Sequence, residues 1–200
     1  MLKMVTGVEC QPMLIFTALQ EEIPTLHKED HVFVTGLGKV NATLQATKLI
    51  LEHTPNLVVN FGTAGSISRE HGQGLVECTG FIQRDMDCSP LGFDKYVTPY
   101  EEEHHLIGSS EIVCGSGDNF MTDAGELPSA GVHIVDMEAY AIAKVCRNLG
   151  VQFRCFKYIS DNADENAGDD WSTFEHAKAE KLFIEQLASI RERINSPRTN

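Results

Sequence analysis

The chain has 200 residues, of which 42% are hydrophobic and 22% charged, and its formal net charge is −13. This length fits one domain with a substantial core, and the acidic balance argues against a nucleic-acid surface, which needs a basic patch. No apolar run approaches the length of a membrane span, and the start of the chain lacks the pattern of a signal peptide, so we expect no membrane partner.

Cysteine usage predicts a reducing environment. No two cysteines have the C-x-x-C spacing, and none combines with histidine at the spacing of a zinc finger. The six cysteines are Cys10, Cys78, Cys88, Cys114, Cys146 and Cys155. Several lie in apolar surroundings, where a free cysteine behaves as a small hydrophobe. We therefore expect a cytoplasmic protein without a disulfide framework.

The first half of the chain alternates short apolar runs with one helical pattern. Strands are predicted at residues 13–19, 31–35, 57–61 and, with weaker patterning, 75–82. A helix over residues 40–53 is indicated by the helical spacing of Val40, Leu44 and Leu51, and a proline two residues later would end it. The stretch 85–110 is rich in glycine, proline and charge, and we predict that it is mainly loop.

The second half continues the alternation of strands and helices. Short strands are predicted at 112–114 and 132–135, a helix at 138–149, a strand at 151–160 and a final helix that begins near Ser172. Gly150 would cap the first of these helices. Ser172 and Glu175 fit a capping box for the second, which also has an apolar stripe. That stripe consists of Phe183, Leu187, Ile190 and Ile194.

Strands that alternate with helices predict an α/β fold with three layers, in which helices flank both faces of a mixed, mostly parallel central sheet. No internal repeat, low-complexity tract or linker divides the chain. The expected organisation is an N-terminal extension at 1–12, a single compact domain at 13–194 and a polar tail at 195–200.

The segment from Val132 to Ala143 is typical of a buried strand that runs directly into a helix, with Glu138 at the junction. A carboxylate there would lie against the positive end of the helix dipole and near unpaired backbone N–H groups. The sequence therefore predicts that Glu138 is ionised and binds a ligand rather than donating a proton.

Three more polar groups follow other strand-like runs: Glu22, the Thr63 hydroxyl and Asp161. Ligands of an open α/β sheet bind beyond the carboxyl ends of its strands, so we expect these side chains to meet Glu138 at one edge of the sheet. Each also has a simpler interpretation. Glu22 could belong to a solvated helix start, and Asp161 to an N-cap and turn.

Two glycine-containing segments could bind phosphate or simply turn the chain. Gly36-Leu-Gly38-Lys39 lacks both the Walker spacing and the third glycine of a dinucleotide loop, so a tight strand-to-helix turn is the better interpretation. Gly62-Thr-Ala-Gly65 follows a buried strand, where small residues would let backbone N–H groups and the Thr63 hydroxyl face a ligand. A turn explains that segment equally well.

Four motifs resemble, in the same order, those of the nucleoside phosphorylase and nucleosidase superfamily, and most of all the bacterial 5′-methylthioadenosine/S-adenosylhomocysteine nucleosidases. They are Gly36-Leu-Gly-Lys-Val-Asn41, Asn60-Phe-Gly-Thr-Ala-Gly65, Val135-Asp-Met-Glu-Ala139 and Ile159-Ser-Asp-Asn-Ala-Asp164, and the resemblance covers roughly residues 13–190. It implies a nucleoside phosphorylase-like fold, hydrolysis of the N-glycosidic bond of a purine nucleoside, and a place in nucleoside metabolism such as methionine salvage.

The resemblance also implies catalytic roles. Glu22 matches the base that activates the attacking water. Asp161 matches the acid that donates a proton to N7 of the departing purine, and Glu138 matches the carboxylate that accepts a hydrogen bond from the ribose 2′-hydroxyl. These roles suit the chemistry, because breaking the bond builds positive charge on the sugar and negative charge on the base. Asp161 must then hold a proton near neutral pH, and burial beside an apolar strand could raise its pKa.

The same resemblance implies how the substrate is held. Met137 matches the neighbour that packs on the sugar and Phe120 the aromatic that stacks on the base, although both would otherwise be assigned to the core. The expected substrate-binding residues are Thr63, Ala64, Gly65, Phe120, Met137, Glu138 and Ser160. The expected substrate is an adenosine altered at the 5′ carbon, with no metal or organic cofactor, and the partner is a second copy of the chain in a homodimer.

Two departures from the superfamily pattern bear on the reaction. Asn60 stands where the phosphorylases carry an arginine for phosphate, and asparagine has no charge to hold that anion. This favours water as the nucleophile, but it leaves open a phosphate-dependent purine nucleoside phosphorylase. A nucleoside-binding protein without turnover is a third possibility, against which the three acids together argue. The second departure is Lys157, which stands where the nucleosidases usually have arginine.

Overall fold

The computed structural model describes residues 13–67, 72–100 and 112–195. The strands are β1 (Met13–Thr17), β2 (Val32–Val34), β3 (Leu57–Ser66), β4 (Leu75–Cys78), β5 (Gly80–Gln83), β6 (Val113–Ser116), β7 (Ile134–Asp136) and β8 (Gln152–Asp161). The helices are α1 (Lys39–His53), α2 (Ala139–Leu149), α3 (Ala167–Thr173) and α4 (His176–Asn195). Short 3₁₀ turns are η1 (Gln20–Glu22), η2 (Leu26–Lys28), η3 (Ser89–Leu91) and η4 (Leu127–Ala130).

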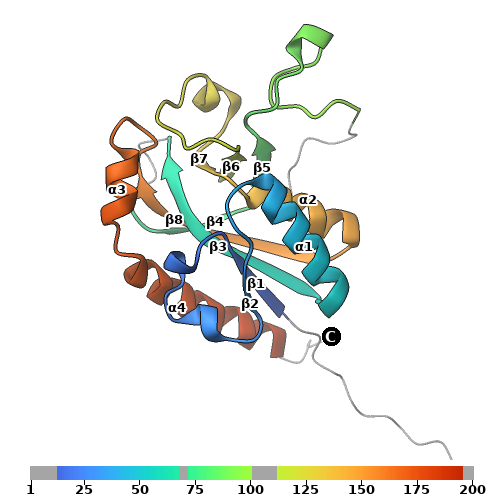
Figure 1. Ribbon diagram of the computed structural model, residues 1–200, viewed down its shortest axis with the longest axis vertical. Coiled ribbons are helices and arrows are strands. Elements are labelled where there is room, and N and C mark those ends of the chain that lie inside the picture. The colour runs from blue at the N-terminus through green and yellow to red at the C-terminus, as the bar shows by residue number, and fades with distance from the viewer. Residues whose placement is uncertain (1–12, 68–71, 101–111, 196–200) are drawn as a thin grey trace, which may run out of the picture.

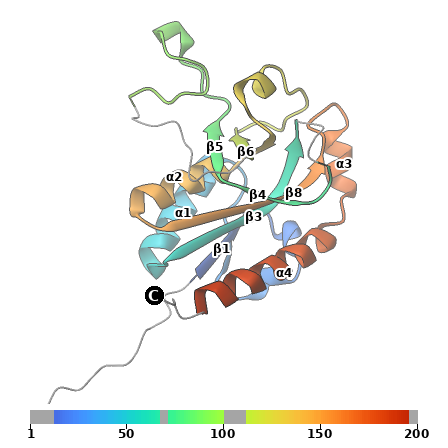
Figure 2. The ribbon, with the colours of Figure 1, turned by 180° about the vertical axis from the view of Figure 1, so that it is seen from behind.

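The strands form one mixed sheet in the order β2-β1-β3-β7-β6-β5, and β8 pairs with both β3 and β4. Most pairs are parallel, whereas β3/β7 and β4/β8 are antiparallel. Helices α1 and α2 lie on one face of the sheet and α4 on the other (Figures 1 and 2). This arrangement confirms the predicted three-layer α/β fold with a mostly parallel sheet.

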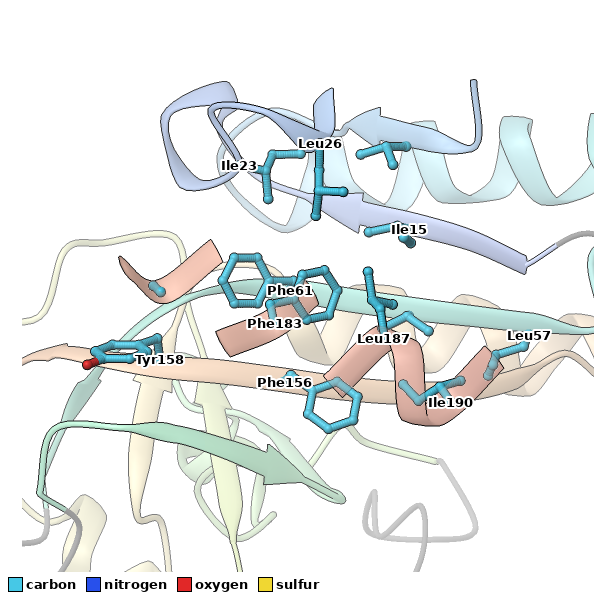
Figure 3. Close-up of a cluster of buried hydrophobic side chains, with 13 residues drawn as sticks. Ile15, Ile23, Leu26, Leu57, Phe61, Phe156, Tyr158, Phe183, Leu187 and Ile190 are labelled. Carbon is cyan, nitrogen blue, oxygen red and sulfur yellow. The ribbon is translucent and has the colours of Figure 1, made fainter. Parts of the chain in front are cut away.

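The core under α4 joins that helix to β1, β3 and β8 (Figure 3). Phe61 of β3 stacks on Phe183 of α4 with ring centroids 4.2 Å apart and an interplanar angle of 8°. Leu187 and Ile190 of the predicted α4 stripe are also buried, whereas Ile194 is 47% exposed. Each fully buried side chain of this size contributes about 1.5–3 kcal/mol, so the cluster anchors α4 firmly to the sheet.

Helix α1 has nearly its predicted bounds but buries a different face. Its small side chains Ala42 and Ala46 pack with Leu49 and Ile50 against the sheet and α2. The apolar residues that indicated the helix are exposed instead, with Val40 at 77%, Leu44 at 63% and Leu51 at 62%. The helical period was therefore right and the implied buried stripe wrong, because alanines permit a closer approach than leucines.

Strand β3 is longer than predicted. It continues through Gly62-Thr-Ala-Gly65 to Ser66, so that segment is strand rather than a turn. Its glycines allow close approach, because a Cβ at Gly65 would lie 2.5 Å from the Asp161 carboxylate. The predicted strand at 75–82 is two strands, β4 and β5, which pair with different neighbours.

The predicted start of the last helix is wrong. Ser172 lies inside a separate helix, α3, where its hydroxyl donates to the Asp169 carbonyl, and α4 begins only at His176. The residues of the predicted capping box therefore do not cap α4, because the serine hydroxyl makes a hydrogen bond within α3 instead. Helix α3 was not predicted.

Other sequence predictions agree with the structure. Gly36 and Gly38 make the tight turn before α1 with φ values of +82° and +87°, and Gly150 caps α2 with φ of +70°. The part of the predicted loop that is described contains only η3, and it projects beyond the end of the sheet (Figure 1). The rest of that loop, the extension at 1–12 and nearly all of the tail lie outside the described residues. No helix within the described ranges is long and apolar enough to cross a membrane.

Candidate active site

A cavity of about 240 Å³ lies among the ends of β1, β3, β7 and β8. All nine predicted site residues line it, although they come from segments far apart in the sequence. They are Glu22, Thr63, Ala64, Gly65, Phe120, Met137, Glu138, Ser160 and Asp161. The predicted convergence is therefore present in the structure.

The pairing of β3 creates room for this cavity. Strand β8 follows one edge of β3 from Leu57 to Gly65, so β1 and β7 share the other edge. Strand β1 pairs only as far as Asn60, and β7 pairs only with Gly65 and Ser66. The backbone between these two partners, including the Thr63 N–H, is left free of sheet pairing on that edge. A backbone donor is thereby available at the cavity wall.

Glu22 fills this gap. Its Oε1 accepts hydrogen bonds from the Thr63 N–H at 2.7 Å and the Thr63 hydroxyl at 2.9 Å. Its Oε2 accepts from the Thr17 hydroxyl at 2.7 Å and from the backbone N–H groups of Ala18 and Leu19, both at 3.2 Å. Five donors for about four lone-pair positions match an ionised carboxylate. Glu22 is buried, so the interpretation as a solvated helix start is wrong.

Asp161 lies at the end of β8, against Gly65. Its Oδ2 accepts from the Ser160 hydroxyl at 2.8 Å, and its Oδ1 accepts from the Ala163 N–H at 2.9 Å. Burial raises the pKa of Asp161 despite these two bonds. The direction agrees with the sequence prediction, and it makes Asp161 a better proton donor near neutral pH than an exposed aspartate.

Glu138 does not have the charge state that the sequence predicted. Burial, with the Asp136 carboxylate nearby, raises the pKa of Glu138 to about 8, which favours its protonated form at neutral pH. The first N–H groups of α2 do not reach it, because Ala139 N–H donates to Asp136 and Tyr140 N–H to the Ser116 hydroxyl. Glu138 Oε1 accepts instead from the Gly38 N–H at 2.8 Å. The helix N-terminus therefore stabilises the carboxylate of Asp136 and not that of Glu138.

A buried ion pair lies behind the cavity. Lys157 Nζ is 2.8 Å from Asp136 Oδ2, and both side chains are almost fully buried. Burial by itself would raise the pKa of Asp136 and lower that of Lys157, because it disfavours both charges. The attraction between the two groups is stronger than this effect of burial, so the pKa of Asp136 is lowered and the pKa of Lys157 is raised. A Cβ at Gly62 would lie 3.0 Å from Glu22 Oε1 and 3.2 Å from Lys157 Nζ, so this cation also lies close to Glu22.

Arg84 supports the opposite wall. Its guanidinium donates to the Asn119 side chain at 2.8 Å, to the Asn119 carbonyl and to the Gly117 carbonyl at 3.3 Å. A Cβ at Gly117 would lie 2.8 Å from the guanidinium carbon, so the arginine packs directly on this backbone. These contacts hold the segment that presents Phe120 to the cavity.

Several lining residues were not singled out from the sequence. They are Ala18, Leu19, Leu37, Arg84, Asn119, Met121, Val135, Asp136 and Trp171. Asp136 could have been identified from the sequence, because it precedes Met137 and Glu138 in the motif Val135-Asp-Met-Glu-Ala139. Arg84 and Trp171 could not have been, because they lie between the segments to which the sequence assigned a structure and belong to none of the four motifs. Their contribution depends on contacts distant in sequence.

The cavity offers general acid–base chemistry. It brings together a carboxylate that accepts five hydrogen bonds and two carboxyl groups whose pKa values are raised. Such a division of protonation states is the pattern of acid–base hydrolysis at a glycosidic bond. Within residues 13–67, 72–100 and 112–195, no three histidine, cysteine or acidic side chains lie close enough to hold a metal ion.

A family model described as the phosphorylase superfamily matches residues 23–115 and 112–195 of this chain. The protein belongs to this superfamily. One superfamily relative is the 5′-methylthioadenosine/S-adenosylhomocysteine nucleosidase of Exiguobacterium sp., which is 30% identical over 72% of each chain. Another is the aminodeoxyfutalosine nucleosidase of Helicobacter pylori, which is 31% identical over 74% of each chain.

Solved structures of the superfamily share the fold. A crystal structure of the Helicobacter pylori 5′-methylthioadenosine/S-adenosylhomocysteine nucleosidase aligns with a TM-score of 0.79 and 25% identity, and the alignment covers 90% of this chain and 98% of that one. That protein is complexed with an amino-pyrrolo-pyrimidine linked to a pyrrolidinol that carries a thioether.

Asn60 is buried and is not among the residues that line the cavity. Its amide nitrogen donates to the Phe16 carbonyl at 3.0 Å, and its oxygen accepts from the Cys155 thiol at 3.4 Å. Both ends of the amide are therefore used within the core. Its bearing on phosphate stays a prediction.

Proposed function

We propose that this member of the superfamily hydrolyses the N-glycosidic bond of a purine nucleoside, a 5′-modified adenosine such as methylthioadenosine or S-adenosylhomocysteine, and releases the free base. The observation that carries the proposal is the meeting of Glu22, Glu138 and Asp161 in one cavity with different protonation environments. The nucleosidase names of its relatives support the same reaction.

Glu22 is the group that accepts a proton from the attacking water. Its hydrogen bonds fix its orientation at the gap between β1 and β7. Removing the proton as water approaches the anomeric carbon prevents a positive charge from building on the nucleophile. A positioned base of this kind typically contributes about 10²–10⁴-fold to the rate.

Asp161 acts on the leaving base and Glu138 acts on the sugar. Protonated Asp161 donates to N7 of the purine, so that the base leaves as a neutral molecule. Glu138 bonds the ribose 2′-hydroxyl. The sugar becomes cationic in the transition state, and an opposite charge within about 4–6 Å favours the ionised form of a carboxyl group. Glu138 then stabilises that cation, while Met137 and Phe120 pack on the sugar and the base.

Water is the favoured nucleophile because the one cation in the described lining of the cavity already donates to protein groups through both terminal nitrogens. Among the described lining residues, the one lysine or arginine is Arg84, and its terminal nitrogens donate to Asn119 and Gly117. A phosphate ion is normally held by charge-assisted, often bidentate donors. The buried position of Asn60 adds none.

The test is base release from a panel of nucleosides with and without phosphate. We expect release from methylthioadenosine or S-adenosylhomocysteine at a rate that phosphate does not change, measured by chromatography of the free base. Adenosine, inosine and futalosine-type compounds complete the panel. Strict dependence on phosphate, with formation of a sugar 1-phosphate, would identify a phosphorylase. Tight nucleoside binding without release would identify a binding protein.

We also propose that the protein is a homodimer. The exposed apolar residues of α1, namely Val40, Leu44 and Leu51, form a stripe along one side of that helix. Leu37, which is 50% exposed, lies three residues before Val40 and lines the cavity. A second copy that covers this stripe would exclude water from apolar surface and would help to close the cavity.

Leu44→Glu is expected to convert the dimer to a monomer, because a charge would be buried in the apolar interface. Analytical ultracentrifugation at micromolar concentration measures the change. The matched control is Glu52→Lys, which also alters charge on an exposed position of α1 but lies about 100° around the helix from Leu51. A monomeric wild-type protein, or a dimer in both variants, would refute the assignment of the stripe.

A cytoplasmic location and a role in methionine salvage are part of the same proposal. Cys78, Cys88, Cys114, Cys146 and Cys155 are all free thiols, which suits a reducing compartment. The salvage role follows from the substrate class, and it requires base release from methylthioadenosine in the nucleoside panel.

A further inference from the structure

The single tryptophan of the chain, Trp171 of α3, is hydrogen-bonded to the proposed catalytic machinery. Its Nε1–H donates to the Thr63 hydroxyl oxygen at 3.0 Å, and that hydroxyl donates to Glu22 Oε1 at 2.9 Å. All three side chains line the cavity. A continuous chain of hydrogen bonds therefore runs from α3 to the carboxylate that faces the nucleophile.

The direction of every bond in this chain is determined by chemistry. An indole N–H can only donate, and an ionised carboxylate can only accept. The Thr63 hydroxyl must therefore accept from Trp171 and donate its one proton to Glu22. The β-branched threonine has a stiff χ1 angle, and the Thr63 backbone N–H, which also donates to Glu22 at 2.7 Å, holds the residue in place.

This arrangement decides what Thr63 can offer to a water molecule. With one lone pair bonded to Trp171 and its proton on Glu22, the hydroxyl has a lone pair left and no proton to spare. A water beside it can donate one hydrogen to Thr63 and the other to Glu22, where it replaces one of the two 3.2 Å bonds from the Ala18 and Leu19 N–H groups. The oxygen of that water then keeps a lone pair for the anomeric carbon. Without the indole N–H, the hydroxyl could rotate and donate to the water, which would occupy the lone pair needed for attack.

We infer that Trp171 is a positioning residue for the hydrolysis proposed above, which acts through Thr63 by keeping that hydroxyl an acceptor toward the attacking water. The indole ring is itself held in place by His176, with ring centroids 5.1 Å apart at 66°. Hydrogen bonds in a chain also strengthen one another, so the indole reinforces the contact between Thr63 and Glu22.

A double-mutant cycle on kcat tests the inference. Trp171→Phe keeps an aromatic ring on the cavity wall and removes only the donor. We expect kcat to fall about tenfold, as for the loss of one hydrogen bond, with little change in KM. Thr63→Val removes the hydroxyl, and in that background Trp171→Phe should cost almost nothing further. In a Thr63→Ser background, which keeps the hydroxyl, the tenfold loss should return.

Equal losses from Trp171→Phe in the wild-type and Thr63→Val backgrounds would overturn the inference, because the tryptophan would then act by a different route. A change in KM alone would do the same, since it would mark Trp171 as a wall of the binding site only. A wild-type protein that releases no base would overturn the proposed function, and the catalytic role of Trp171 with it.

The hydrogen bond itself can be tested without activity. Because the chain has one tryptophan, a ¹⁵N-labelled sample gives one indole N–H resonance. We expect Thr63→Val to shift this resonance and to speed its exchange with solvent, and Thr63→Ser to leave both nearly unchanged. The same shift and exchange rate in wild type and Thr63→Val would show that the bond is absent in solution and would overturn the inference.

Discussion

Asp161→Asn is expected to lower kcat by about 10²–10⁴-fold, the usual contribution of a general acid. The asparagine cannot give a proton to the leaving base, but it can keep the shape of the site. Its oxygen can still accept from the Ala163 N–H, and the Ser160 hydroxyl can rotate to accept from its amide. We therefore expect thermal unfolding close to that of the wild type, measured beside steady-state base release.

The control is Asp169→Asn, which removes an exposed carboxylate of α3 that does not line the cavity. Its kcat should stay near the wild-type value. Equal activity in Asp161→Asn and the wild type would reject the acid role, whatever the stability of the variant.

The pH profile gives a second signature of the same residue. Burial raises the pKa of Asp161, so the protonated acid persists to higher pH than in an ordinary aspartate. Activity that depends on this proton should fall as the pH rises through the raised pKa. The Asn variant has no such proton, and the residual rate should lack that fall.

Glu22→Gln is expected to lower kcat by about 10²–10⁴-fold as well, because an amide cannot take a proton from water. Here the structure predicts a cost in stability too. Both oxygens of Glu22 accept hydrogen bonds, from Thr63 on one side and from Thr17, Ala18 and Leu19 on the other. The amide NH₂ must face donors on either side, and an unsatisfied buried group costs about 1–3 kcal/mol.

Measurement therefore combines chemical denaturation with kcat per folded molecule, at a temperature where the variant is folded. Glu180→Gln is a matched control, because Glu180 is also buried and one of its oxygens, Oε1, accepts both Thr25 and Leu26 N–H groups. A glutamine oxygen can keep both bonds, so stability and kcat should change little. A folded Glu22→Gln variant with wild-type kcat would reject the base role.

Much of the local structure could be predicted because it depends on neighbours along the chain. The alternation of apolar runs indicated most strands, and Gly36, Gly38 and Gly150 marked turns whose φ values require glycine. Errors arose where a local pattern has more than one structural use. Ser172 and Glu175 fit a cap but belong to α3 and the residues that follow it, and Leu44 and Leu51 of α1 face outward.

The site also has features that the sequence could predict and features that it could not. The sequence and its motifs were enough to select nine residues that line the cavity, including Thr63, Phe120 and Asp161. The charge of Glu138 could not be obtained that way. The local argument from the helix dipole predicted an anion, whereas burial and Asp136 raise its pKa to about 8. Trp171 could not be found at all, because its partner Thr63 is 108 residues away.

The sequence alone therefore determined the alternating α/β elements, the superfamily and the identity of the chemical groups, since these follow from residue type and short-range spacing. The tertiary structure decided how the groups are used. Strands β1 and β7 share one edge of β3 and leave the Thr63 N–H unpaired between them, so that Glu22 can bind there. Strand pairing and burial are set by contacts between distant segments, and they control hydrogen bonding and protonation in the cavity.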